Sequence, residues 1–324
     1  FTVKFDGDYD ESHLAKLTSD RYSTDHHELK ISYNLENDLE KILTNYGQPF
    51  MDSSAIPSYY VSQAAKKHVT VALNGDGADE LFGGYRRYVP FSSKHYNHFS
   101  KISWLKYFLP FPQKKNSLYN YFHRLLNTSM KSGIDHYLST TTDIFEDFKT
   151  FQKNKIFYEM QSFIESIDLN PVEKLQYLDF RLLLASNLLV KMDISTMSQS
   201  LEGRSPFLSK YFLDFAPKLS SSDRIRGGKT KFILRELSKK YLDETICIQP
   251  KRGFESPISK WIDNEIKSIV CDYLYRDSFS SKFIDKNFIL NLIDNKISIS
   301  SEKRAKIIWT LLTLEIWHEK IVKA

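Results

Sequence analysis

Two glycines and three acidic residues lie together in residues 75–80, Gly-Asp-Gly-Ala-Asp-Glu. Val71 to Asn74 before them is predicted to be a short buried strand, and Ala78–Phe82 the start of a helix. A glycine turn between a strand and a helix lets backbone N–H groups approach a phosphate, and the helix dipole favours negative charge there. Because the carboxylates would repel a bare phosphate, a bound nucleotide implies a cation such as Mg²⁺. No Gly-Lys-Ser/Thr follows, so this is not the common P-loop, and a simple tight turn is the alternative.

Longer motifs are more specific than this pattern. Residues 75–88, GDGADELFGGYRRY, resemble the signature of the asparagine synthetase family, which typically reads SGDGADELFGGY followed by Arg and Tyr. Residues 188–208, LLVKMDISTMSQSLEGRSPFL, resemble the family's LLVKVDR and SMAHSLEVRVPFLD. The resemblance runs from Phe1 to about Ile321 and is to the ATP-dependent, amide-forming domain of that family.

Strands alternate with helices in residues 1–100, which predicts a parallel sheet. The expected strands are Phe1–Phe5, a segment ending near Ile31, and Val69–Leu73; the expected helices are Glu11–Tyr22, Leu35–Tyr46 and Ala55–Lys67. Leu35, Leu39, Ile42 and Leu43 share one helix face, and Asp52 or Ser53 is expected to cap the helix at Ala55. The spacing of apolar residues predicts helices from 101 to 168, over 171–200, and over Lys306–Ile321, where Trp309 is a core residue.

The resemblance implies an α/β fold, with a parallel sheet of the adenine-nucleotide alpha-hydrolase (pyrophosphate-loop ATPase) type and a large helical C-terminal portion. It implies one synthetase-like domain over residues 1–324. Residues 1–100 would form the α/β nucleotide-binding part, and residues 101–324 the mostly helical part that completes the active site.

The resemblance also assigns nucleotide-binding residues. It implies that FTVKF, including Val3, lines the adenine pocket, and that Asn74, Gly75 and Gly77 bind ATP. It assigns Asp79 to Mg²⁺ and pyrophosphate. ATP and Mg²⁺ are therefore the cofactors that the resemblance predicts.

Catalytic roles follow from the same motifs. Asp76 is expected at the edge of the acyl and amine site. Tyr85 is expected to lie on the same helix as Asp79, one face further round, and to orient the amine. Pro250–Pro257 (PKRGFESP) resembles the family's KxGFxxP loop, in which the lysine reaches the reacting centre. Lys251 would then neutralise charge that develops on the α-phosphate and the acyl oxygen.

Lys191, Asp193 and Glu202 are possible acceptor-site residues, since their motif lies beside the acyl-adenylate site in the family. Several charged family positions are changed here: Ser186-Asn187 replaces two aspartates, Ile194 an arginine and Ser209 an aspartate. Recognition of aspartate needs complementary charge, so these changes bear on the identity of the acceptor.

The family's SGGxDS pyrophosphate loop, expected just before FTVKF, does not occur, and neither does a glutaminase domain with its N-terminal cysteine. We therefore expect a fragment that cannot by itself form amide bonds at a useful rate. Loss of a central strand would expose two sheet edges, so a homo-oligomer is possible.

Three functions remain open. The first is asparagine synthesis from aspartate, with ammonia delivered from glutamine by a missing domain. The second is another carbon–nitrogen ligase of this family that acts on a sugar acid or a peptide carboxylate. The third is a catalytically inactive scaffold.

Composition limits the expected partners and cellular location. The 324 residues carry 45 basic and 40 acidic side chains, a small excess that does not indicate nucleic-acid binding. Two cysteines cannot form a disulfide framework, which favours the cytoplasm. No apolar run approaches the ~18 residues of a membrane span, so no membrane partner is expected.

Three tempting signals have simpler explanations. Asp6–Asp10 begins like a calcium loop but lacks the glycine and glutamate at its sixth and twelfth positions. His26-His27 are adjacent, and neighbours on a strand point to opposite faces, so structural histidines are expected. Arg226–Lys231 (RGGKTK) could form a phosphate loop, but we interpret it as a structural turn before a helix.

Overall fold

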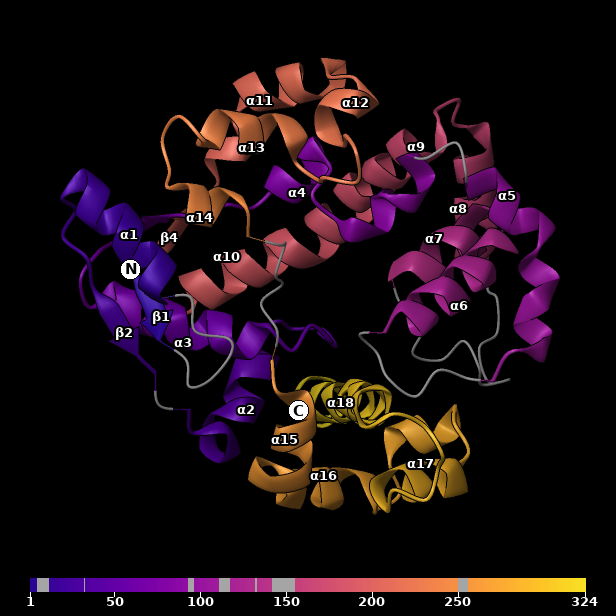
Figure 1. The fold of residues 1–324 in the computed structure, drawn as a ribbon. Helices are drawn as coiled ribbons and strands as arrows, with labels where there is room; N and C mark the ends of the chain where they lie inside the picture. The colour runs from indigo at the N-terminus through magenta and orange to yellow at the C-terminus, as the bar shows by residue number, and fades with distance from the viewer. Residues whose placement is uncertain are drawn as a thin grey trace. The chain divides into compact units, whose positions relative to one another are not determined.

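The computed structural model describes residues 1–4, 12–31, 33–92, 96–110, 117–131, 133–141, 155–249 and 256–324. These residues form two compact units (Figure 1). The first comprises residues 1–75, 187–206 and 237–324, and the second comprises residues 76–186 and 207–236. The predicted calcium-like segment Asp6–Asp10 lies outside the described residues.

The first unit contains all four described strands and many helices. Its strands are β1 (Thr2–Lys4), β2 (Glu28–Lys30), β3 (Val71–Leu73) and β4 (Glu202–Arg204). Its α-helices are α1 (Ser12–Tyr22), α2 (Leu35–Thr44), α3 (Ala55–Lys66), α10 (Leu189–Met197), α14 (Glu244–Cys247), α15 (Ile258–Lys260), α16 (Lys267–Leu274), α17 (Lys286–Ile293) and α18 (Ser301–Trp317). Shorter turns are π-helical over Trp261–Glu265 and His318–Val322 and 3₁₀ over Phe279–Lys282.

The strands pair in parallel, as predicted. Within the described residues they form two separate sheets, β1 with β2 and β3 with β4, rather than one. Val3 lies opposite Leu29, and Ala72 lies opposite Gly203. Both pairs contribute to one small core, in which Leu29 and Leu201 are buried and Ala72 packs against them.

The prediction that the strand before the glycine turn is buried was wrong. Val71 is 38% exposed and Leu73 is 73% exposed. Alternate side chains of a strand point to opposite faces, and only Ala72 faces the core of Leu29, Ala65 and Leu201. In the part of the chain that the structure describes, nothing comparable covers the other face.

The α2 helix was predicted accurately because its apolar residues follow the helical period. Leu35, Leu39, Ile42 and Leu43 are all buried. The cap of α3 is one residue later than predicted, at Ser54. Asp52 still contributes, since its carboxylate accepts hydrogen bonds from the backbone N–H of Ser54 at 3.0 Å and from its hydroxyl at 2.6 Å.

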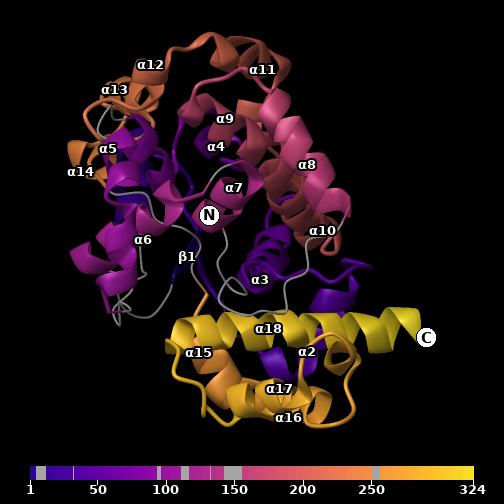
Figure 2. The ribbon, with the colours of Figure 1, turned by 90° about the vertical axis from the view of Figure 1, so that its right-hand side faces the viewer.

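The C-terminal helix α18 is the centre of a helical layer in the first unit. Figure 2 shows α18 lying across α2 and α15–α17, which it contacts. Trp309 is 1% exposed, as expected of a core residue, and its indole N–H donates to the carbonyl of Met51 at 3.1 Å. Burial of a large aromatic side chain with a satisfied polar atom fixes this helix strongly against the segment before α3.

The second unit is helical in its described residues, which include the helices predicted from residue 101 to 168. Its α-helices are α4 (Ala78–Phe82), α5 (Tyr96–Lys101), α6 (Leu118–Ser129), α7 (Gly133–Thr141), α8 (Lys155–Ser166), α9 (Pro171–Leu178), α11 (Lys210–Phe215), α12 (Ser221–Arg224) and α13 (Phe232–Ser238), whose last two residues belong to the first unit. Short 3₁₀ turns are η1 (Arg86–Tyr88), η2 (Pro90–Ser92), η3 (Ser103–Phe108), η5 (Pro206–Leu208) and η6 (Ala216–Lys218).

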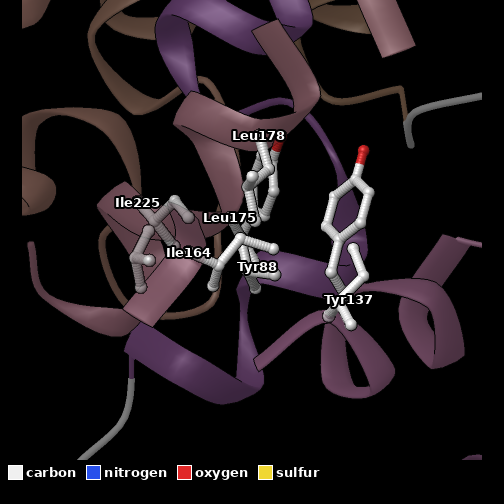
Figure 3. Close-up of a cluster of buried hydrophobic side chains, with 8 residues drawn as sticks. Tyr88, Tyr137, Ile164, Leu175, Leu178 and Ile225 are labelled. Atoms are coloured by element: carbon white, nitrogen blue, oxygen red, sulfur yellow. The ribbon is translucent and has the colours of Figure 1, made fainter. Parts of the chain in front are cut away.

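The second unit has a core formed by residues distant in sequence. Figure 3 shows one buried cluster that includes Tyr88, Tyr137, Ile164, Leu175, Leu178 and Ile225. The apolar positions predicted for the helix at 171–200 thus include true core residues. That helical stretch is continuous, running from α9 through the π-helical Asp179–Leu188 into α10.

Among the described helices, none combines the length and the apolar composition that crossing a bilayer requires.

Candidate functional site

The glycine loop leaves β3 at the carboxyl end of the β3–β4 pair. The backbone N–H of Asn74 donates to the carbonyl of Arg204 at 2.8 Å, which extends the pairing by one residue. The Ser205 hydroxyl donates to Asn74 Oδ1 at 2.6 Å. Ligands of parallel sheets bind beyond the carboxyl ends of the strands, so Asn74 and Gly75 lie where a ligand is expected.

Gly77 connects the loop to α4 and needs to be glycine. It is the N-cap of α4 with a φ of 88°, in the left-handed region. A Cβ atom at this position would lie 2.3 Å from Leu208 Cδ2. Gly75 has neither constraint, since a Cβ there meets nothing within 4 Å.

Gly77→Ala is therefore expected to destabilise the second unit by about 2–4 kcal/mol, the sum of a left-handed backbone and an overpacked contact. Gly75→Ala, two residues away, is the matched control and should change the free energy of unfolding by less than about 1 kcal/mol. The denaturant midpoint of each variant gives the comparison, and equal midpoints would contradict this account.

Asp79, in the first turn of α4, forms an ion pair that the sequence did not reveal. Its Oδ1 lies 2.9 Å from Nζ of Lys231, and both side chains are mostly buried. The backbone N–H of Lys231 also donates to the carbonyl of Gly83 at 3.3 Å. The segment Arg226–Lys231, which we interpreted as structural, thus places an ammonium beside the carboxylate assigned to Mg²⁺ and pyrophosphate.

Close packing maintains this pair. A Cβ atom on Gly84 would lie 1.8 Å from Asp79 Oδ1 and 2.5 Å from Lys231 Cε. Gly84 therefore leaves the space in which the carboxylate and the lysine meet. The turn before Lys231 is equally dependent on glycine, because Gly227 and Gly228 have φ values of 57° and 76°.

Tyr85 is not placed as predicted. Helix α4 ends at Phe82, because Gly83 adopts a left-handed C-cap with a φ of 68°, and Tyr85 follows in extended conformation. It therefore does not share a helix with Asp79. Its hydroxyl donates instead to the carboxylate of Glu80, which is 3% exposed. Burial, more than any charge, raises the pKa of Glu80 above its ordinary value.

A second buried carboxylate, Asp179, fixes the segment after Tyr85. It is 0% exposed and lies 2.7 Å from Arg87 Nη2 and 3.0 Å from the donating hydroxyl of Tyr137. The hydroxyl of Tyr88 donates to its other oxygen. The Arg87 guanidinium in turn lies 4.1 Å from the ring centroid of Tyr85. Asp179 thus positions Arg87, and Arg87 positions Tyr85.

In the first unit, Lys191 is held by Asp52 and Ser54. Its Nζ lies 3.2 Å from Asp52 Oδ2 and donates to Ser54 Oγ at 2.8 Å. Asn187 donates to the same Asp52 oxygen at 3.3 Å. Burial alone would raise the pKa of Asp52, but Lys191 and Ser54 hold it below its ordinary value. This charge pair is therefore neutral overall.

The other two acceptor candidates lie at the surface. The Asp193 side chain is exposed. Glu202 accepts a hydrogen bond from Arg204 Nε at 2.8 Å, and both side chains are more than half exposed. The three acceptor candidates therefore have different surroundings, and only Lys191 belongs to a buried polar cluster.

Three candidates remain. Val3 pairs through its backbone with Leu29 in the first unit, and Asp76 is half-buried at the start of the second. Lys251 lies outside the described residues. The histidine pair behaves as expected: His26 Nε2 lies 3.0 Å from Thr2 Oγ1, and His27 stacks on the ring of Phe1 with 5.4 Å between centroids.

A magnesium ion fits this donor set only together with a nucleotide. Within the described residues, no three His, Cys, Asp or Glu side chains form a metal-binding group. Asp79 is a hard oxygen donor, and Mg²⁺ is commonly held by one or two carboxylates plus substrate phosphates. Asp79 could hold such an ion on a bound pyrophosphate group, in place of Lys231.

Comparison with known proteins identifies the family of this chain. The family model described as asparagine synthase matches residues 1–319, so the chain belongs to the asparagine synthase family. It is 33% identical over 294 residues to asparagine synthetase [glutamine-hydrolyzing] 1 of Bacillus subtilis, a match covering 87% of this chain and 45% of that protein.

More distant relatives carry other descriptions. A putative asparagine synthetase [glutamine-hydrolyzing] of Mycobacterium tuberculosis is 28% identical over 295 residues, covering 88% of this chain and 44% of the relative. The amidase chyE of Penicillium rubens is 24% identical over 312 residues, a match that covers 83% of this chain and 46% of that protein. The chain thus spans less than half the length of each of these relatives.

Proposed function

We propose that this chain carries the ATP-dependent half of a carbon–nitrogen ligase, on a fold of the adenine-nucleotide alpha-hydrolase type spanning residues 1–324. In this reaction a carboxylate oxygen attacks the α-phosphorus of ATP and releases pyrophosphate. An amine nitrogen then attacks the acyl carbon, loses a proton, and AMP leaves. The preferred acceptor is aspartate, with ammonia delivered from glutamine.

The Asp79–Lys231 pair is the observation that carries this proposal. A glycine loop at the carboxyl end of parallel strands leads into a helix whose first turn holds a carboxylate beside an ammonium. The carboxylate suits Mg²⁺ on a pyrophosphate group, and the ammonium suits the phosphate oxygens themselves. On the family resemblance we also assign the backbone groups of Asn74, Gly75 and Gly77 to ATP binding, and Val3 to the adenine pocket.

The remaining residues are assigned to the second half-reaction. We assign Asp76 to the edge of the acyl and amine site. Tyr85 orients the amine through a hydroxyl that Glu80 holds in place. Lys191, with Asp193 and Glu202, belongs to the proposed acceptor side.

Lys251→Met in the full-length gene product is expected to abolish product formation, a loss of at least about 100-fold, because no fixed ammonium then meets the charge on the α-phosphate and acyl oxygen. Nucleotide binding, measured by titration with ATP, should be retained. Turnover close to that of the unmodified protein would reject the assignment of Lys251.

ATP–pyrophosphate exchange with the full-length gene product tests the function itself. Exchange that depends on aspartate would establish asparagine synthesis, and comparison of glutamine with ammonia as the nitrogen source would define the amine route. Absence of exchange with every carboxylate tested would reject the ligase proposal and leave a scaffold.

A second candidate is a ligase for another carboxylate, such as a sugar acid or a peptide. The neutral cluster around Lys191 favours it. Ile194 stands where the family has an arginine, and Asp52 already neutralises the buried ammonium of Lys191. This leaves the cluster without the net positive charge that would favour a dicarboxylate. Exchange with such an acid but not with aspartate would select this candidate.

A further inference from the structure

Two neighbouring elements of the second unit expose large apolar side chains. On η3 these are Trp104, Tyr107 and Phe108, and on α6 they are Leu118 and Tyr121; we call these five residues the aromatic patch. Phe108 is 78% exposed and Leu118 is 88% exposed. Helices of water-soluble proteins normally turn such residues inward, and an exposed apolar patch usually marks an interaction surface.

Two hydrogen bonds join the elements that carry the patch. The hydroxyl of Tyr119, next to Leu118, donates to the carbonyl of Pro110, which follows η3 closely. Lys106 Nζ, on η3, donates to Asn127 Oδ1 on α6. Trp104 and Phe108 meet edge to face with 6.0 Å between ring centroids. The bond between Tyr119 and Pro110 brings the end of η3 close to the start of α6, and Phe108 and Leu118 lie on these two segments. Figures 1 and 2 show α6 beside α5, which it also contacts.

The charge of this part of the sequence is one-sided. From Leu81 to Ile134 there is no aspartate or glutamate, although the chain has 40 acidic residues. The same stretch carries nine basic residues: Arg86, Arg87, Lys94, Lys101, Lys106, Lys114, Lys115, Arg124 and Lys131. Lys101 on α5 and Arg124 on α6 are exposed. Arg87 is neutralised by Asp179, but Lys101 and Arg124 leave positive charge on the elements around the patch. Such a surface is complementary to an anionic surface that also accepts apolar groups.

We infer that the aromatic patch binds the surface of an anionic lipid bilayer. Tryptophan and tyrosine suit the headgroup level, while Phe108 and Leu118 can enter the acyl boundary. Lysine stems bury their methylenes and keep the ammonium at the phosphates. Nucleic acid fits less well, because Leu118 has no ring to stack on a base and Lys101 lacks the forked donors of arginine. The proposed contact is peripheral and needs no helix that crosses the bilayer.

The chain offers a matched control. Helix α11, also in the second unit, exposes Tyr211 and Leu213. Its charges are balanced, since Lys210 pairs with Asp214 at 2.7 Å. We compare the double variant Phe108→Ser/Leu118→Ser with Tyr211→Ser/Leu213→Ser. Trp104 is retained in both, so its fluorescence reports on the patch.

The experiment uses the full-length gene product and vesicles of phosphatidylcholine, alone or with about one-third phosphatidylglycerol. We expect co-sedimentation with the anionic vesicles only, weakening at high salt, and a blue shift of the fluorescence that Trp104→Phe removes. Phe108→Ser/Leu118→Ser should reduce the partition coefficient at least about tenfold, and the α11 variant less than about twofold. Lys101→Glu/Arg124→Glu should also weaken binding to anionic vesicles.

Far-UV circular dichroism and thermal melting establish that the variants are folded, which is expected because the exchanged side chains lie in solvent. Equal binding to neutral vesicles, equal loss in both double variants, or no binding to either vesicle would overturn the inference. So would binding to a single-stranded RNA oligomer, through the same patch, that is tighter than binding to the anionic vesicles.

Discussion

Replacing Asp179 by alanine is expected to destabilise the second unit by about 3–5 kcal/mol. The carboxylate is 0% exposed and accepts from Arg87, Tyr88 and Tyr137. Its removal leaves a mostly buried guanidinium without a counter-charge and two buried hydroxyls without an acceptor. The free energy of unfolding from guanidinium denaturation measures the loss, and hydrogen exchange in α9 assigns it to this unit.

Two further variants show whether the loss of stability comes from the unpaired buried charge. Asp214→Ala removes an exposed carboxylate from its pair with Lys210 and should cost less than about 1 kcal/mol. Asp179→Leu combined with Arg87→Met replaces both charges by apolar groups and should recover much of the loss. If Asp179→Ala is no more harmful than Asp214→Ala, the buried network does not stabilise the unit.

Lys231→Met is expected to reduce ATP–pyrophosphate exchange by about 100-fold in the full-length gene product. The ammonium is 2.9 Å from Asp79, so it lies where we propose that the pyrophosphate group and its Mg²⁺ bind. Without it, less of the negative charge of the leaving group is neutralised. The effect should lie in both the pyrophosphate KM and the maximal rate.

Asp79→Asn should reduce exchange to a similar extent, and it should also raise the Mg²⁺ concentration that gives half-maximal exchange. Because the two side chains act as a pair, the double variant should lose less than the sum of the two effects. Lys229→Met changes an exposed lysine of the same turn and serves as the control. Similar exchange in the Lys229 and Lys231 variants would remove Lys231 from the site.

Local patterns predicted the elements well where the amphipathic period was clear. Leu35, Leu39, Ile42 and Leu43 identified the buried face of α2 without any tertiary information. The burial of β3 could not be predicted in this way. A run such as Val71–Leu73 is apolar in either case, and the strands and helices that flank it decide which side chains are covered.

The site was predictable as a stretch of chain but not as a set of contacts. Asp79 was singled out by its motif, whereas its partner Lys231 lies more than 150 residues away and no local rule connects the two. The misplacement of Tyr85 was avoidable. Gly83-Gly84 after Phe82 is a common helix stop, and a left-handed glycine there would have separated Tyr85 from α4.

The open side of β3 also bears on the association of one copy of this chain with another. Among the described residues β3 hydrogen-bonds only to β4, and it exposes Val71 and Leu73 beside its other edge. Such an edge is a template on which a second extended segment can add. Lys66 and Lys67 lie shortly before the strand, and their charges would disfavour the approach of an identical copy. Salt screens this repulsion, so we expect association through this edge to increase with ionic strength.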